Sequence, residues 1–374
     1  MKYGKRNQVS LNPLDYNICL MGLSKIGKTT LIHEVCQKLT GDDGYLFCEM
    51  GAERGADAIQ GIPYVNCTSW SDEYDDIENT IGFATLVEDI VENKSDDYAD
   101  LKTIVVDTYD FYIELAEAES IRFYNKQCRE RNEADKVVKT INAAWGGYGR
   151  GEKYAIELMF NLVDKLASVG VHTIFIAHTK NKELTDVVSG TSYSILTCDM
   201  QNNYFNALKK KLHFLGVAYF DRDIAKDKNS KKNKIITENR RIKFRSDDYS
   251  VDSGSRFADI VDDIPLDADE FIKALTDAIE SESKKSGKSI AETAKEQKKT
   301  EKAKAEKAKA VETKAKSEGE LTDSVNKIME YFQENHGDLD KVKPIVAEIK
   351  KLGYDKPQSI SSLDDAKAIL KLCK

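Results

Sequence analysis

GLSKIGKTT, residues 22 to 30, is the stretch of sequence that decides the fold. Its two glycines stand five residues apart and are followed at once by a lysine and two threonines, which fits the pattern G-x-x-x-x-G-K-[ST]. An apolar run from Asn17 to Met21 precedes it, and apolar residues at helical spacing follow it from Leu31 to Leu39. A strand, a glycine-rich loop and a helix in this order predict a phosphate-binding P-loop. The alternative is a glycine turn before an ordinary amphipathic helix.

The predicted P-loop implies a nucleotide and a metal ion as ligands. Its backbone amides and the first turn of the helix point at phosphates, and glycines supply backbone conformations closed to residues with a Cβ. The Lys28 side chain is expected to neutralise the β and γ phosphates, and the Thr29 hydroxyl to bind Mg²⁺. The predicted cofactors are therefore ATP and Mg²⁺. The predicted nucleotide-binding residues are Gly22, Leu23, Ser24, Lys25, Ile26, Gly27, Lys28, Thr29 and Thr30.

Composition excludes several other classes of protein. The 374 residues carry a net charge of −8, which argues against a chain coated in positive charge but leaves room for a local basic patch. No apolar run is long enough to span a membrane and the first ten residues hold no apolar signal segment, so we expect a cytoplasmic protein without a membrane partner. Seven scattered cysteines form no C-x-x-C pair and five histidines form no ligand-spaced cluster, so no structural zinc site is expected.

Residues 17 to about 265 alternate between strand-like and helical patterns, which predicts an α/β domain with a mostly parallel sheet. We expect this domain to span residues 1–280. The predicted strands are Asn17 to Met21, Tyr45 to Met50, Thr103 to Asp107, Val171 to Ala177, His213 to Phe220 and Arg241 to Phe244. The predicted helices are Thr29 to Leu39, Ile77 to Val91, Phe111 to Arg131, Tyr154 to Ser168 and Met200 to Lys211.

The composition changes sharply after about residue 280. The stretch 291–320 is almost entirely Ala, Lys, Glu and Thr, and it lacks the apolar face of a packed helix. We interpret residues 281–320 as a solvated, partly helical spacer, because a coiled coil would need Leu or Ile at its a and d positions. Apolar periodicity returns at Val325 and continues to Leu370, which predicts a small three-helix module over residues 321–374.

An acidic residue at a strand end is the second part of a magnesium-nucleotide site. LKTIVVDTYD places Asp107 directly after an apolar strand, as in the Walker B pattern, although a core strand ending in a capping Asp would look the same. The strand Tyr45 to Met50 comes between the P-loop unit and Asp107. This order resembles the RecA-like and AAA classes, in which the two motif strands are not neighbours. That resemblance implies a water-activating glutamate in LFCEMGAERGAD, either Glu49 at the strand end or Glu53 in the loop, with a slight preference for Glu53.

HTIFIAHTK ends another buried strand with a histidine. We expect His178 at the same sheet edge as Asp107, where a polar side chain can touch the γ phosphate and report its loss. A half-buried histidine at a strand end is an equally good interpretation.

Several of these motifs together resemble phage-encoded AAA-type ATP-binding proteins of RecA-like fold, a group that includes single-strand annealing recombinases. The resemblance lies in GLSKIGKTT, the E-x-x-x-E-x-G-A-D run, TIVVDTYD, WGGYGRG, FIAHTK and RRIKFR…GSRFADI, and it covers about residues 15 to 265. It implies a RecA-like P-loop ATPase that acts on single-stranded DNA. It also implies that Arg256 lies at a subunit edge of a homo-oligomer, against the alternative of a pair with Asp259 or Asp262.

Basic stretches offer a candidate DNA surface in an otherwise acidic chain. KKKLHF and KDKNSKKNKIITENRRIKFR concentrate lysine and arginine, which bind phosphate backbones without sequence preference. WGGYGRG adds aromatic residues that stack on bases of a single strand. Lysine-rich loops are also commonly solvated hairpin tips. The candidate DNA-binding residues are Trp145, Tyr148, Arg150, Lys231, Lys232, Lys234, Arg240 and Arg241.

The sequence thus predicts an ATPase that acts on single-stranded DNA in recombination or annealing. One alternative is a nucleotide-gated adaptor or loader that recruits a replication or recombination protein through its C-terminal helices. A small-molecule kinase is a further alternative, but the chain shows no arginine-rich lid and no acceptor motif.

Overall fold

The computed structural model describes most of the chain, in two units. The described residues are 8–297 except 53, 186–189, 191, 227–232, 246–250, 286–289 and 296, and 324–373 except 326, 333, 334, 336–338 and 355. The units are Met1–Thr293 and Ala294–Lys374. Most of the predicted spacer, together with Glu53, Lys231 and Lys232, lies outside the described residues.

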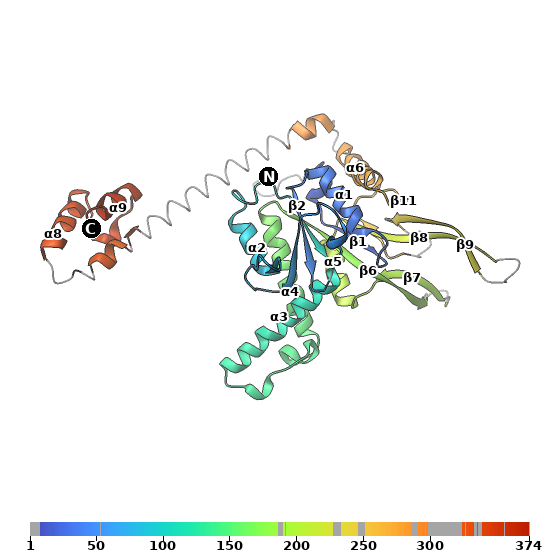
Figure 1. The fold of residues 1–374 in the computed structure, drawn as a ribbon, viewed down its shortest axis with the longest axis horizontal. Helices are drawn as coiled ribbons and strands as arrows, with labels where there is room; N and C mark the ends of the chain where they lie inside the picture. Colours follow the sequence, from blue (N-terminus) through green and yellow to red (C-terminus); the bar gives the residue numbers. More distant parts are fainter. Residues whose placement is uncertain are drawn as a thin grey trace. The chain divides into compact units, whose positions relative to one another are not determined.

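A single twisted sheet organises the first unit (Figure 1). Its described strands follow the order β11-β9-β8-β1-β6-β5-β2-β3-β4, with β10 paired to β8 and β7 paired to β6. The strands from β8 to β4 pair in parallel, whereas β7, β9, β10 and β11 join antiparallel, so the predicted mostly parallel sheet is confirmed. The bounds are β1 Ile18–Gly22, β2 Tyr45–Met50, β3 Tyr64–Ser69, β4 Thr80–Gly82, β5 Thr103–Asp107, β6 His172–Thr185, β7 Ser192–Cys198, β8 Phe214–Lys226, β9 Asn233–Lys243, β10 Gly254–Ser255 and β11 Asp263–Pro265.

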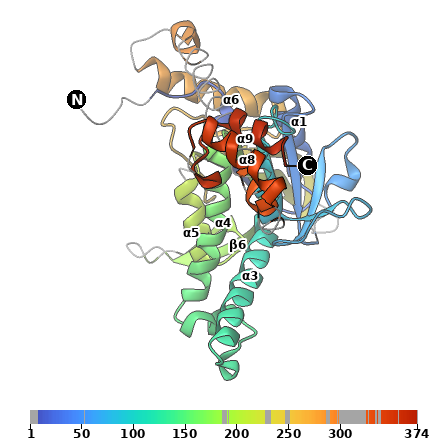
Figure 2. The ribbon, with the colours of Figure 1, turned by 90° about the vertical axis from the view of Figure 1, so that its left-hand side faces the viewer.

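Helices cover both faces of this sheet. Because successive side chains of a strand point to opposite faces, Cys19 and Met21 of β1 face one apolar core, and Ile18 and Leu20 face the other. The first core is closed by α2 Phe83–Glu92, α3 Tyr109–Glu130, α4 Arg150–Ser168 and α5 Asn202–Lys211. The second is closed by α1 Lys28–Thr40 and α6 Ala268–Lys284. In Figure 2, α3 and α4 run side by side, as their contacts require. No helix of the described residues has the length and apolar character needed to span a membrane.

The strand order determines the fold class. β6 lies between β1, which leads into the P-loop, and β5, which ends at Asp107. The two motif strands are therefore not neighbours, as the sequence led us to expect, and the first unit has a RecA-like α/β fold. Ligands of such open parallel sheets bind at the carboxyl ends of the strands, where the P-loop and Asp107 lie.

Some predicted boundaries are wrong, for local reasons. The helix predicted from Ile77 begins at Phe83, because the Asp75 carboxylate accepts the backbone N–H groups of Ile77 and Glu78 and holds a turn there. The structure adds β3, β4, β7, β10 and β11, which we did not predict. It also places β9 at Asn233–Lys243 where we expected the four residues Arg241 to Phe244. Helix α4 begins four residues before the predicted Tyr154, at Arg150.

The second unit has a small core of its own. Residues 324–325 and 327–332 are helical, and α8 Leu339–Lys351 and α9 Leu363–Leu370 follow. Buried side chains of these helices meet Ile360, from the segment between α8 and α9, in one cluster; its members are Ile328, Ile345, Ile349, Ile360, Ala366 and Ile369. These helical residues lie within the range 321–374 predicted for the C-terminal module, and its three-helix character stays a prediction.

Candidate functional site

The P-loop joins the carboxyl end of β1 to the first turn of α1. Gly27, the residue before the helix, has φ +106°, in the left-handed region that favours glycine. Lys28 is buried, and its Nζ donates to the carbonyl oxygens of Gly22 and Leu23, both at 3.0 Å. The lysine ammonium is therefore held over the loop, where a phosphate bound to the loop amides would meet it.

Thr29 and Asp107 form the contact that unites the two sequence motifs. The Thr29 hydroxyl donates to Oδ2 of Asp107 at 2.7 Å, although the two residues stand 78 positions apart. A Cβ on Gly55 would lie 3.2 Å from Thr29 Oγ1 and 3.6 Å from Asp107 Oδ2, so the backbone of Gly55 passes close over the pair. Mg²⁺ prefers oxygen ligands and is commonly held by one carboxylate, a hydroxyl and substrate phosphates, so this donor set fits it.

Glu49 stands beside Asp107 at the same edge. The two residues are partners in the register of the parallel strands β2 and β5. Glu49 is buried, and its Oε1 accepts the backbone N–H of Ala56 at 2.6 Å. The structure thus brings Glu49 to the candidate site, whereas the other candidate, Glu53, lies outside the described residues.

His178 is level with the start of the P-loop, because it pairs in register with Gly22. The Asp110 carboxylate holds it twice, with Oδ2 at 3.0 Å from Nδ1 and at 3.1 Å from the backbone nitrogen. A carboxylate at Nδ1 favours a proton on that nitrogen and directs Nε2 away from it. The predicted strand end at His178 is wrong, because β6 continues to Thr185 and pairs with β7 beyond His178. The pairing with β1 does end at His178, which places it at the expected level of the sheet, and its contact with a γ phosphate stays a prediction.

The two adjacent arginines of β9 have different partners. Arg240 Nη1 donates to the carbonyl oxygen of Ile26, in the P-loop, at 3.2 Å. Arg241 Nε donates to Oδ2 of Asp263 on β11 at 2.8 Å, and Tyr219 donates to the same oxygen. Both were predicted to bind DNA. Arg240 adjoins the candidate nucleotide site and Arg241 is in an ion pair, and their binding to DNA stays a prediction. Of Lys234, only its backbone in β9 is described.

Part of the WGGYGRG stretch packs against the neighbouring helices α3 and α4. Trp145 packs against Phe123 and Tyr154, and its indole N–H donates to Ser120 at 3.2 Å. Arg150 begins α4. Tyr148 is different, because 99% of its surface is exposed. Of the two aromatic side chains predicted to stack on bases, only that of Tyr148 is fully accessible.

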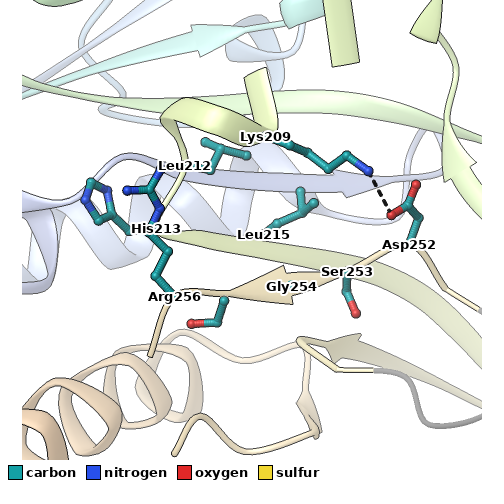
Figure 3. Close-up of a pocket in the computed structure, with 9 residues that line it drawn as sticks. Lys209, Leu212, His213, Leu215, Asp252, Ser253, Gly254 and Arg256 are labelled. Atoms are coloured by element: carbon teal, nitrogen blue, oxygen red, sulfur yellow. Dashed lines mark hydrogen bonds and ion pairs between the residues drawn. The ribbon is translucent and has the colours of Figure 1, made fainter. Parts of the chain in front are cut away.

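Arg256 lies at the opposite sheet edge from the P-loop, near Phe214, which pairs with the first residue of β1. It lines a hollow of about 260 Å³ together with Lys209, His213 and Asp252 (Figure 3). Its guanidinium donates to the Lys210 carbonyl at the end of α5. Among the described residues, Arg256 forms no ion pair with Asp259 or Asp262, the alternative partners that the sequence offered. Its place at a subunit edge stays a prediction.

A family model places the chain among known proteins. The model of an AAA-domain family matches residues 14–257, more than half of the chain. The chain belongs to this family of AAA domains. A search of curated proteins gave no match. Among solved structures, the chain is similar to the KaiC-like protein of the hyperthermophilic archaeon Pyrococcus horikoshii OT3, at 14% identity over 62% of this chain and 80% of that one, with a TM-score of 0.31.

Sequence reasoning missed three residues of this AAA site. Gly55 closes over Thr29 and Asp107, Asp110 holds His178, and Arg240 contacts the P-loop. Asp110 had a signal, since it follows the strand end in TIVVDTYD by three positions and starts the next helix. Gly55 lies in the E-x-x-x-E-x-G-A-D run, so its stretch was singled out for the site, but its approach to Thr29 and Asp107 was not predicted. Arg240 was predicted only as a DNA-binding residue, because its contact with the P-loop joins chain segments that meet only in the folded protein.

Proposed function

We propose that this AAA protein binds ATP with Mg²⁺ and hydrolyses it to ADP and phosphate. The observation that carries the proposal is the 2.7 Å contact between Thr29 and Asp107 beside a buried lysine. A hydroxyl, a carboxylate and a lysine converge there with the amides of a helix N-terminus, the set that P-loop enzymes use for phosphoryl transfer.

Each residue has a role that follows from its position. The loop amides and Lys28 bind the phosphates and stabilise the negative charge that develops on them. Thr29 and Asp107 would hold Mg²⁺, which neutralises phosphate charge and orients the terminal phosphate for attack. Glu49 is buried beside Asp107 and is the described carboxylate suited to orient the attacking water, with Glu53 as the alternative. His178 lies at the same edge and would contact the γ phosphate.

We also propose that the ATPase acts on single-stranded DNA in recombination or annealing. The support is the lysine-rich stretch between β8 and β9, the exposed Tyr148 and the sequence resemblance to phage recombinases. A nucleotide-gated adaptor is the second candidate, because the C-terminal unit has its own apolar core and is suited to bind a replication protein.

ATP turnover decides between these functions. We expect phosphate release that requires Mg²⁺ and rises with single-stranded DNA more than with duplex DNA or RNA. Lys28→Met is the control, since it removes the cation at the phosphates and keeps the aliphatic stem. Turnover by Lys28→Met at the parent rate would refute the site, and slow turnover that no nucleic acid changes would favour the adaptor.

A further inference from the structure

Arg240 connects the β8–β9 hairpin to the P-loop. Its Nη1 donates to Ile26 O across 214 positions of sequence, and a Cβ on Gly27 would lie 3.1 Å from the same nitrogen. The backbone of Arg240 is fixed as well, because its carbonyl accepts the N–H of Leu266 at 2.9 Å. The guanidinium therefore lies directly against the peptide bond between Ile26 and Gly27.

That peptide bond belongs to the phosphate-binding surface. In a trans peptide the carbonyl and the N–H point in opposite directions. A donor that holds the Ile26 carbonyl on one side of the loop therefore turns the Gly27 N–H toward the other side. Gly27 is the residue before α1, where backbone N–H groups bind phosphate. Arg240 is well suited to hold this carbonyl, since its guanidinium is planar and permanently charged.

Two neighbouring arginines of the hairpin, Arg222 and Arg241, pair with carboxylates. Arg222 on β8 pairs with Glu238 on β9 at 2.5 Å, and its guanidinium lies over the Phe220 ring. Arg241 is paired with Asp263. The Arg240 side chain differs from these two, because its described hydrogen bond goes to a backbone carbonyl of the P-loop.

We propose that Arg240 is a positioning residue of the nucleotide site. It fixes the peptide between Ile26 and Gly27 so that the Gly27 amide points at the phosphate next to the loop. The inference rests on the proposed function only in that the phosphate belongs to ATP or ADP. It also makes the β8–β9 hairpin a part of the nucleotide site.

Nucleotide affinity tests the proposal, with fluorescent ATP and ADP analogues titrated in the absence of nucleic acid. Both nucleotides place a phosphate on the loop amides, so Arg240→Ala should bind both about three- to tenfold more weakly, the worth of one hydrogen bond. Arg240→Lys should recover part of the loss, because an ammonium can still donate to the Ile26 carbonyl. Arg222→Ala, the matched control from the same hairpin, should bind both nucleotides like the parent.

Three results would overturn the proposal. Unchanged nucleotide affinity in Arg240→Ala would show that the hydrogen bond from Arg240 to Ile26 does not contribute to nucleotide binding. A loss for ATP with none for ADP would place Arg240 on the γ phosphate instead. An equal loss in Arg222→Ala would trace the effect to folding of the hairpin.

Amide hydrogen exchange tests the same contact without nucleotide. In Arg240→Ala the P-loop amides, residues 23–27, should exchange faster than in the parent, while β1 and the centre of α1 keep their rates. Equal P-loop rates would contradict the proposal. A parent chain that binds neither nucleotide would refute the proposed function, and the exchange result would still decide the role of Arg240.

Discussion

Glu49 and Asp107 lie side by side at the carboxyl ends of β2 and β5, as partners in the strand register. Both are buried, yet they have different contacts: Asp107 accepts the Thr29 hydroxyl, and Glu49 accepts the Ala56 backbone N–H. Two carboxylates in neighbouring positions with different partners are suited to different tasks. Asp107 adjoins the residue that would bind the metal ion, and Glu49 lies one strand further along the edge.

We predict that Glu49→Gln lowers ATP turnover about 100-fold or more, the usual effect of losing a general base, while ATP affinity stays within about threefold. Glutamine keeps the oxygen that accepts the Ala56 N–H, so the fold should not change. Steady-state turnover and a nucleotide titration measure the two effects. Glu53→Gln is the matched variant, and a loss of turnover there with a normal Glu49→Gln would assign the water to Glu53.

Asp107→Asn should instead raise the Mg²⁺ concentration needed for half-maximal turnover, because an amide is a weaker ligand for a hard cation than a carboxylate. The Thr29 hydroxyl can still donate to the amide oxygen, so the melting temperature should change little. A Mg²⁺ titration of turnover provides the measurement. An unchanged Mg²⁺ requirement would contradict the assignment of Asp107.

The lysine-rich stretch should govern binding to single-stranded DNA. Replacing Lys231, Lys232 and Lys234 by Glu should weaken binding to all sequences alike and flatten its salt dependence, because phosphate contacts release counterions and carry no base information. Titration of labelled single strands at two salt concentrations measures both effects. Equal affinity and slope in parent and variant would remove this stretch from the DNA-binding hypothesis. ATP affinity without DNA serves as the control for folding.

The first unit should fold and bind ATP without the second. A chain that ends at Thr293 keeps α6, whose Phe271 and Leu275 are buried in the core under α1, so its melting temperature should stay within a few degrees. A chain that ends at Asp267 loses both side chains, each worth about 1.5–3 kcal/mol of burial, and should be far less stable. Thermal melts compare the two truncations. Aggregation of the longer one would contradict the boundary.

Stability should fall as the pH drops below about 6.5, the ordinary pKa of histidine. Burial lowers the pKa of His213, and the positive charges of Arg256 and of protonated His172 lower it further. The neutral His213 ring accepts the Asn17 N–H at 3.3 Å through Nδ1. Burial also lowers the pKa of His172. The unfolded chain therefore binds more protons than the folded one as the pH falls, which costs at most about 1.4 kcal/mol per pH unit for each group.

Urea melts at pH 7.5, 6.5 and 5.5 measure this dependence. His213→Asn keeps an acceptor for Asn17 but does not titrate, so it should lower the slope of unfolding free energy between pH 6.5 and 5.5. The same slope in parent and variant would show that His213 does not resist protonation.

The sequence by itself determined which residues form the candidate nucleotide site and the class of the fold. The P-loop pattern, the apolar strands around it and Asp107 at a strand end are local signals, since each depends on residues within one turn or strand of one another. Strands β2 and β5 therefore have the predicted bounds. A local signal also placed Glu49 near the end of β2, where it is found, whereas β6 continues past His178 to Thr185.

Only the tertiary structure decided which of these residues meet and which partners the remaining cations take. The register of β2 against β5 sets Glu49 beside Asp107, and the pairing of β9 with β8 carries Arg240 to Ile26. Strand pairing and register bring together residues that are distant in the chain. A register shift of one residue would move every side chain of the strand to the opposite face of the sheet. Arg240 and Arg241 are identical and adjacent in sequence, yet they face opposite sides of one strand, and only the fold gives them different roles.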